Sequence, residues 1–169
     1  QGSHVAVHYR SQPDAAEAVA ADVRARGCQA VIFQADVSRT ADTDRLAAEV
    51  LARFGHVDIL VNNAGGFIRR VRLAEADDAL IDEGFHLNAR SMLALTRALL
   101  PVMRGRSGAT IINMTSQAAR TGASPGAGLY ASTKAYVSTF TRALAKELAG
   151  DGIRVNAVAP GVIATPIHD

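Results

Sequence analysis

The sequence is poor in cysteine and in aromatic residues. It has one cysteine, Cys28, no tryptophan and only 5% aromatic residues in total. A lone cysteine excludes an internal disulfide and fits a reducing compartment. No apolar run approaches the ~18 residues of a membrane-spanning helix, and no signal peptide is visible, so we expect a cytoplasmic protein without membrane attachment.

Neither sign of charge is in large excess. The 18 basic and 16 acidic residues give a net charge of +2, and their mixing along the chain argues against a nucleic-acid surface. The cluster of Arg69, Arg70 and Arg72 is most simply an exposed loop. His4 and His8 are roughly 13 Å apart in a predicted strand, too far to share a zinc ion, and we predict no metal site.

The chain of 169 residues alternates short apolar segments with longer amphipathic ones. The predicted strands are residues 2–9, 31–35, 57–61, 109–115 and 153–158. The predicted helices are residues 13–26, 40–54 and 128–149, and residues 77–104 are mostly helical. This alternation is typical of right-handed βαβ units. We therefore predict one α/β domain over residues 1–169, a doubly wound, Rossmann-like parallel sheet between two layers of helices.

Small and polar residues follow the predicted strands, where parallel sheets present their ligand sites. These stretches are Tyr9-Arg10-Ser11, Asp36-Val37, Asn62-Asn63-Ala64-Gly65-Gly66 and Pro160-Gly161-Val162-Ile163-Ala164-Thr165. The third stretch is too small and polar for a core, and it suits the close approach of a ligand to the backbone. We therefore expect the functional residues at the carboxyl edge of the sheet.

Tyr130 and Lys134 are four residues apart in the predicted helix 128–149 and therefore share a face. An ammonium at that distance stabilises a phenolate, so Tyr130 is a candidate general acid/base for an alcohol or carbonyl oxygen. Ser116 follows the predicted strand 109–115 and so belongs to the same edge of the sheet. We expect its hydroxyl to hold the reacting oxygen beside the phenol.

Together these stretches resemble the short-chain dehydrogenase/reductase family in its single-domain form. The motifs that carry the resemblance follow the family's order: Asp36-Val37, Asn62-Asn63-Ala64-Gly65, Asn88, Asn113-Met114-Thr115-Ser116, Tyr130-x-x-x-Lys134 and Pro160-Gly161-x-Ile163-x-Thr165. Each motif is modest alone, whereas six in register are specific. The separation of Ser116 and Tyr130 is one residue longer than the family's common spacing, which the intervening loop can absorb.

The resemblance implies roles for four catalytic residues. Tyr130 would transfer the proton, and Ser116 would hydrogen-bond the substrate oxygen. Lys134 would favour the phenolate of Tyr130 and bind the nicotinamide ribose, while Asn88 would hold a water molecule behind Lys134.

A nicotinamide cofactor is implied by the same resemblance. Asp36 would meet the adenine, residues 62–65 the adenosine and ribose side, and Ile163 and Thr165 the carboxamide. With the loop after the first strand, the predicted cofactor-binding residues are Arg10, Ser11, Asp36, Val37, Asn62, Ala64, Gly65, Tyr130, Lys134, Pro160, Gly161, Ile163 and Thr165.

The loop after the first predicted strand bears on the choice between NADP(H) and NAD(H). In a doubly wound fold, an acidic residue in this position binds the ribose 2′-hydroxyl, whereas a basic residue favours a 2′-phosphate. Here the position is Tyr9, followed by Arg10 and Ser11, so NADP(H) is favoured over NAD(H). The alternative is that Arg10 is only a solvated loop residue.

Two parts of the family pattern are absent. A glycine-rich phosphate loop with its strand and helix is expected before Gln1, and substrate-binding helices and a last strand after Asp169, so we expect a fragment of a longer domain.

Gly126-x-Gly128-x-x-Ala131 matches a dinucleotide fingerprint. It opens the helix of Tyr130 and lacks an acidic strand end further on, so we interpret it as a substrate-side loop.

Our leading hypothesis is an oxidoreductase that interconverts a carbonyl and a secondary alcohol of a small molecule with NADP(H). By resemblance it is nearest to 3-oxoacyl-carrier-protein reductases and to reductases of sugars or keto sugar acids. The main alternative is a non-catalytic oligomerisation partner or inactive fragment. A hydrolase with Ser116 as nucleophile lacks the Gly-x-Ser-x-Gly elbow.

The resemblance also predicts how the protein assembles, and the roles of Asn88 and Asp36 each have an alternative. By resemblance, the helical segments 77–104 and 128–149 form a dimer surface, usually within a homotetramer. Asn88 could instead be a buried, satisfied amide, and Asp36 could be a helix or turn cap.

Overall fold

The computed structural model describes residues 2–163, in which strands and helices alternate. In chain order the elements are β1 Val5–Tyr9, α1 Pro13–Ala25, β2 Ala30–Gln34, α2 Thr40–Phe54, β3 Ile59–Asn62, η1 Leu73–Glu75, α3 Asp78–Phe85, η2 His86–Arg90, α4 Ser91–Met103, β4 Thr110–Met114, α5 Ala118–Thr121, α6 Gly128–Glu147, η3 Ala149–Asp151 and β5 Arg154–Val158. Each predicted strand and helix is present, with ends that shift by a few residues.

Local sequence signals explain where the helices begin and end. Pro13 occupies the first turn of α1, where its missing N–H costs no hydrogen bond. α2 ends at Gly55, whose left-handed backbone (φ 76°) closes the last turn. The predicted helical segment 77–104 is divided into α3, the π-helical turn η2 and α4.

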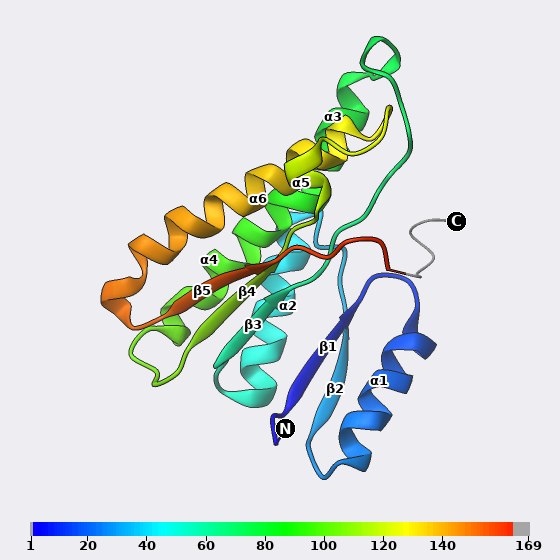
Figure 1. Ribbon diagram of the computed structural model, residues 1–169. Coiled ribbons are helices and arrows are strands. Elements are labelled where there is room, and N and C mark those ends of the chain that lie inside the picture. Colours follow the sequence, from blue (N-terminus) through cyan, green and yellow to red (C-terminus); the bar gives the residue numbers. More distant parts are fainter. Residues whose placement is uncertain (1, 164–169) are drawn as a thin grey trace.

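All strand pairs are parallel. β1 pairs with β2, and β3, β4 and β5 form a second sheet in that order. β1 and β3 face each other across a groove and share no ladder among the described residues (Figure 1). The arrangement is that of a doubly wound fold whose centre has room for one more strand, so the predicted fold class is confirmed.

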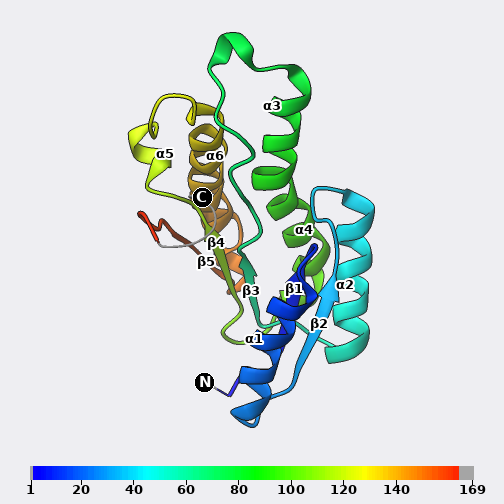
Figure 2. The same ribbon diagram turned by 90° about the vertical axis from the view of Figure 1, so that its right-hand side faces the viewer.

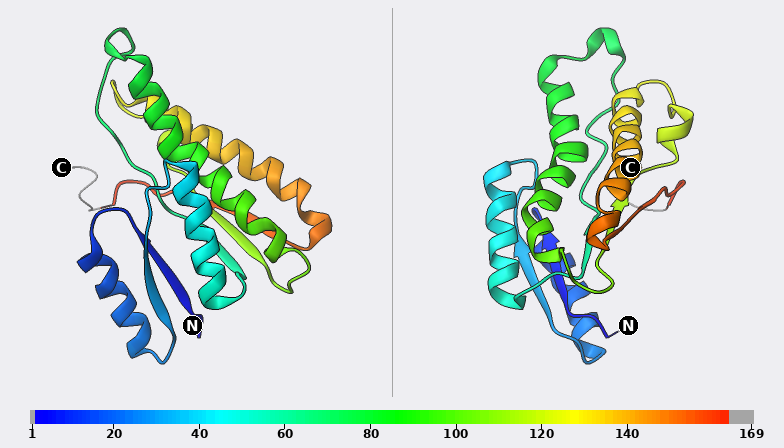
Figure 3. Two further views of the ribbon diagram at one scale, coloured as in Figure 1. Left: turned by 180° about the vertical axis from the view of Figure 1, so that it is seen from behind. Right: turned by 90° about the vertical axis from the view of Figure 1, so that its left-hand side faces the viewer.

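Helices cover both faces of the strands. α2, α4 and α6 pack on one face, where Leu99, Met103, Ile111, Leu144 and Leu148 belong to the main hydrophobic core. Figure 3 shows these three helices together on the back of the molecule. α1 lies against β1 and β2 on the side opposite α2 (Figure 2).

A chain of buried polar side chains crosses this core. The Asn62 amide donates to Asn113 Oδ1 at 2.8 Å and to Thr96 Oγ1 at 3.1 Å, and the Asn113 amide donates to Thr141 Oγ1 at 2.9 Å. These bonds connect α4, β3, β4 and α6 in sequence. Since a buried polar group is costly without its partner, the chain fixes how α6 sits on the sheet.

No helix among the described residues is both long enough and apolar enough to cross a membrane.

Candidate functional site

The candidate site lies where the strands end and α6 begins. β4 ends at Met114 and α6 begins at Gly128, so Tyr130 belongs to the first turn of α6 and Lys134 to the next. α6 packs against β4 and β5 (Figure 1). This packing brings the start of α6 to the carboxyl edge of the three-stranded sheet.

The Lys134 side chain is buried between α6 and the sheet. Its Nζ donates to the Met114 carbonyl oxygen at 2.9 Å and lies 5.9 Å from the centre of the Tyr130 ring. Burial disfavours the ammonium form and lowers the pKa of Lys134 to about 8. The phenol therefore has a nearby cation whose charge changes close to neutral pH.

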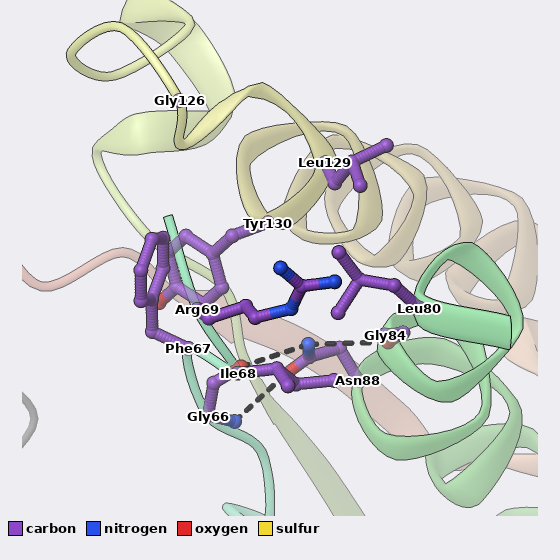
Figure 4. Close-up of a pocket in the computed structure, with 10 residues that line it drawn as sticks. All are labelled: Gly66, Phe67, Ile68, Arg69, Leu80, Gly84, Asn88, Gly126, Leu129 and Tyr130. Carbon is purple, nitrogen blue, oxygen red and sulfur yellow. Dashed lines mark hydrogen bonds between the residues drawn. The ribbon is translucent and has the colours of Figure 1, made fainter. Parts of the chain in front are cut away.

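The π-helical turn η2 presents Asn88 to the loop that follows β3. Asn88 is 2% exposed; its Oδ1 accepts from the Gly66 N–H at 2.9 Å, and its Nδ2 donates to the carbonyls of Gly66 and Gly84 (Figure 4). Such single π turns recur at functional sites. The water-holding role of Asn88 stays a prediction, because these bonds also fit a buried, satisfied amide.

Gly65 lies between Asn88 and Lys134. A Cβ atom at Gly65 would be 2.8 Å from Asn88 Oδ1 and 2.9 Å from Lys134 Nζ, closer than non-bonded atoms approach. Any larger residue would displace one of these two side chains. The glycine therefore permits the loop after β3 to pass directly over the lysine.

Ser116 and Thr115 follow β4 but make different contacts. The Ser116 hydroxyl oxygen accepts from the Ala118 N–H at 3.2 Å, at the start of α5, and the side chain is half-buried. The buried Thr115 hydroxyl donates to the main-chain carbonyl of Lys134 at 2.7 Å. Thr115 thus attaches the lysine turn of α6 to the strand that ends in Ser116.

We expect Thr115→Val to lower turnover about tenfold and to reduce the free energy of unfolding by about 1 kcal/mol. Valine keeps the shape of threonine but removes the hydrogen bond to Lys134, so the helix turn is held less firmly. The control is Thr115→Ser, which retains the hydroxyl and should restore turnover. Equal turnover in the valine and serine variants would show that the hydroxyl does not position Lys134.

A groove of about 1110 Å³ gathers much of the predicted cofactor site. It runs between β1 and β3, and its wall includes Arg10, Ser11, Val37, Asn62, Ala64 and Gly65. The small residues at its β3 end admit a ligand close to the backbone, with the Lys134 ammonium next to Gly65. Arg10 follows β1 at the carboxyl end of this groove, so the residues at that end suit a phosphate-bearing dinucleotide.

Asp36 and Asn62 have protein partners of their own. Asp36 Oδ1 accepts from the Ser38 hydroxyl at 2.6 Å, which lowers the pKa of Asp36, with a smaller contribution from Arg10. The amide of Asn62 is bonded within the polar chain of the core. The turn cap proposed as an alternative for Asp36 is thus present, and both cofactor contacts stay predictions.

The segment after β5 lies next to the segment after Ser116. The Pro160 carbonyl accepts from the Gln117 N–H at 2.9 Å, and a Cβ at Gly161 would be 3.3 Å from Gln117 Oε1. Ile163 is 54% exposed. The predicted contact of Thr165 lies outside the described residues.

Beside Tyr130 is a second, smaller pocket that the sequence did not reveal. It is lined by Phe67, Leu80, Leu129 and Tyr130, and the Arg69 side chain extends into it (Figure 4). Arg69 is exposed, as expected for the cluster of arginines, but it also lines the pocket with Tyr130. Among the described residues, no group of three or more His, Cys, Asp and Glu side chains could hold a metal ion.

Comparisons with known proteins extend over the whole chain. A 3-oxoacyl-[acyl-carrier-protein] reductase from Synechocystis sp. is 40% identical, over 99% of this chain and 67% of that protein. A solved NADH-dependent reductase, A1-R′, responsible for alginate metabolism, is 35% identical, with a TM-score of 0.92 over 97% of this chain and 69% of that one. A short-chain dehydrogenase from Burkholderia cenocepacia in complex with NADP is 32% identical, with a TM-score of 0.90 over 97% of this chain and 66% of the other.

The chain thus spans about two thirds of the length of these relatives. The family model described as short chain dehydrogenase matches residues 1–169. Taken with the parallel fold and the Tyr130–Lys134 pair, this match shows that the chain belongs to the short-chain dehydrogenase family.

Proposed function

We propose that this protein is an NADP(H)-dependent oxidoreductase that interconverts a carbonyl and a secondary alcohol. The observation that carries the proposal is the pair on α6, with the buried Lys134 ammonium 5.9 Å from the Tyr130 ring. A phenol beside a cation is suited to give a proton to a carbonyl oxygen and to take it back in the reverse direction.

The residues of the site then have complementary roles. Tyr130 is the general acid in reduction, and Ser116 donates a hydrogen bond to the same substrate oxygen. Lys134 stabilises the phenolate that remains after proton transfer, and it is held in place by the Met114 carbonyl. The nicotinamide cofactor, when bound, supplies or accepts the hydride.

The carboxyl end of the groove between β1 and β3 is the proposed cofactor site, with Arg10 and Ser11 on the 2′-phosphate of NADP(H). Gly65 and Lys134 would meet the nicotinamide ribose. Relatives do not share one cofactor, since A1-R′ is an NADH-dependent reductase and the B. cenocepacia enzyme was solved with NADP. The preference for NADP(H) therefore rests on the basic residue at the end of β1.

We further propose a homo-oligomer, a dimer or tetramer, assembled through α3, α4 and α6 in the cytoplasm. An aromatic row supports this surface: Phe85 packs edge-on against Tyr136, which stacks on Phe140, with ring centres 5.3 and 5.9 Å apart. Phe85 is 38% exposed, so part of the row is open to a second subunit.

Cofactor binding and turnover test the proposed function. The full-length protein would be titrated with NADPH and NADH by nicotinamide fluorescence, and then assayed by loss of reduced nicotinamide with acetoacetyl thioesters and short oxo acids. We expect tighter binding of NADPH and reduction of at least one carbonyl class. Failure to bind either nucleotide would contradict the proposal and favour a non-catalytic partner.

A further inference from the structure

The pocket beside Tyr130 contains two neighbouring arginines with different surroundings. Arg70 donates to the Ser124 hydroxyl at 2.6 Å, and its guanidinium lies 5.3 Å from the centre of the Phe67 ring. Phe67 in turn packs edge-on against Tyr130, with ring centres 5.7 Å apart. Arg70 therefore supports the aromatic wall of the pocket.

Arg69 has no such partner. None of the described residues forms a hydrogen bond or an ion pair with its guanidinium. In Figure 4 the side chain extends into the space lined by Leu80, Leu129 and Tyr130. No aspartate or glutamate lines this pocket, so the exposed guanidinium lies beside Leu80 and Leu129 without a protein counter-ion.

A guanidinium in this setting is suited to bind an anion. Its planar fork of N–H donors matches a carboxylate in a bidentate geometry. One free arginine balances one negative charge. A carboxylate carries one charge, whereas a phosphate monoester carries about −1.5 to −2 at neutral pH.

We propose that Arg69 binds a carboxylate of the substrate, so that the protein acts on oxo acids rather than on neutral ketones. This inference rests on the proposed function, because it places the substrate carbonyl at Tyr130 and its carboxylate at Arg69 in the same pocket. The two groups would be held by different residues: the carbonyl by Tyr130 and Ser116, and the acid by Arg69.

The test compares Arg69→Gln with Arg72→Gln in the full-length protein. Arg72 belongs to the same cluster but does not line the pocket, so it is the matched control. The substrates are paired: acetoacetate with its methyl ester and levulinate with its methyl ester, with a sugar phosphate ketone as a third arm. Binding of the same acids is measured separately, by calorimetry without turnover.

We expect the wild-type protein to prefer each acid over its ester. In Arg69→Gln, KM for the acids should rise about 10- to 100-fold, while kcat for the acids should change little. Both kcat and KM for the esters should stay close to wild type. Arg72→Gln should behave as wild type with all substrates. Weaker calorimetric binding of the acids by Arg69→Gln is also expected.

The other outcomes separate this inference from the proposed function. Reduction of acids and esters alike, unaffected by Arg69→Gln, would overturn the carboxylate site and leave the reductase standing. An Arg69-dependent preference for the phosphate substrate over the acids would overturn the choice of carboxylate. Arg69-dependent binding of the acids without any reduction would support the carboxylate site and contradict the reductase. If the protein neither bound the acids through Arg69 nor reduced any substrate, both the carboxylate site and the proposed function would be overturned.

Discussion

Tyr130→Phe is expected to lower the rate of carbonyl reduction by about 10²- to 10⁴-fold. Phenylalanine keeps the ring that packs against Phe67 but removes the hydroxyl that would give the proton to the substrate. Binding of NADPH should weaken much less than the rate falls, because Tyr130 is one of many predicted cofactor-binding residues and the others are intact. Steady-state kinetics and fluorescence titration on the same sample measure the two effects.

The matched control is Tyr136→Phe, six residues further along α6. Its ring stacks on Phe140, and no hydrogen bond involves its hydroxyl among the described residues. We expect turnover close to wild type in this variant. If Tyr136→Phe lost as much activity as Tyr130→Phe, or if Tyr130→Phe remained active, Tyr130 would not be the general acid/base.

Lys134→Met is expected to abolish most of the activity and to remove a pH dependence of stability. Methionine fills the buried space but carries no charge. The Tyr130 phenolate therefore loses the cation that stabilises it, and the nicotinamide ribose loses the hydrogen-bond donor proposed for it. We expect turnover at least ~100-fold below wild type. In the wild-type protein, cofactor binding should also weaken as the pH rises through about 8, where Lys134 loses its proton in the cofactor-free structure.

The effect of Lys134 on stability has a defined sign. The folded protein releases the Lys134 proton near pH 8, whereas an unfolded chain retains it up to about 10.5. Between these values the unfolded state binds more protons, so the free energy of unfolding rises with pH, by about 3 kcal/mol in total. Below about pH 8 both states are protonated and the contribution is constant.

Denaturant unfolding of wild type and Lys134→Met across this range isolates the effect, since the other titrating groups are common to both proteins. The difference in free energy of unfolding between wild type and variant should increase from pH 8 to pH 10.5. A constant difference would mean that Lys134 is not desolvated in the folded protein.

Much of the fold could be predicted from the sequence because its signals are local. α2 begins and ends where the predicted helix does, since the apolar stripe and Gly55 specify it without help from the rest of the chain. The same is true of Tyr130 and Lys134, whose spacing on a helix settles that they share a face.

The features that could not be predicted depend on contacts between distant residues. Nothing in the residues 77–104 marks the π turn, which accompanies the bonds of Asn88 to Gly66 and Gly84. The sequence predicts Thr115 only as a residue of the strand 109–115, whereas the structure shows its hydroxyl bonded to the main-chain carbonyl of Lys134. The difference between Arg69 and Arg70 likewise arises from Ser124, more than fifty residues away.

The proposed function gives different tasks to the two sheets. The residues proposed to distinguish one nucleotide from another, Arg10 and Asp36, follow β1 and β2, whereas Ser116, which follows β4, and Tyr130, in α6, are proposed for the chemistry at the substrate oxygen. On the proposed function, substitutions among the first forty residues are therefore expected to change the coenzyme preference while leaving Ser116 and Tyr130 in place.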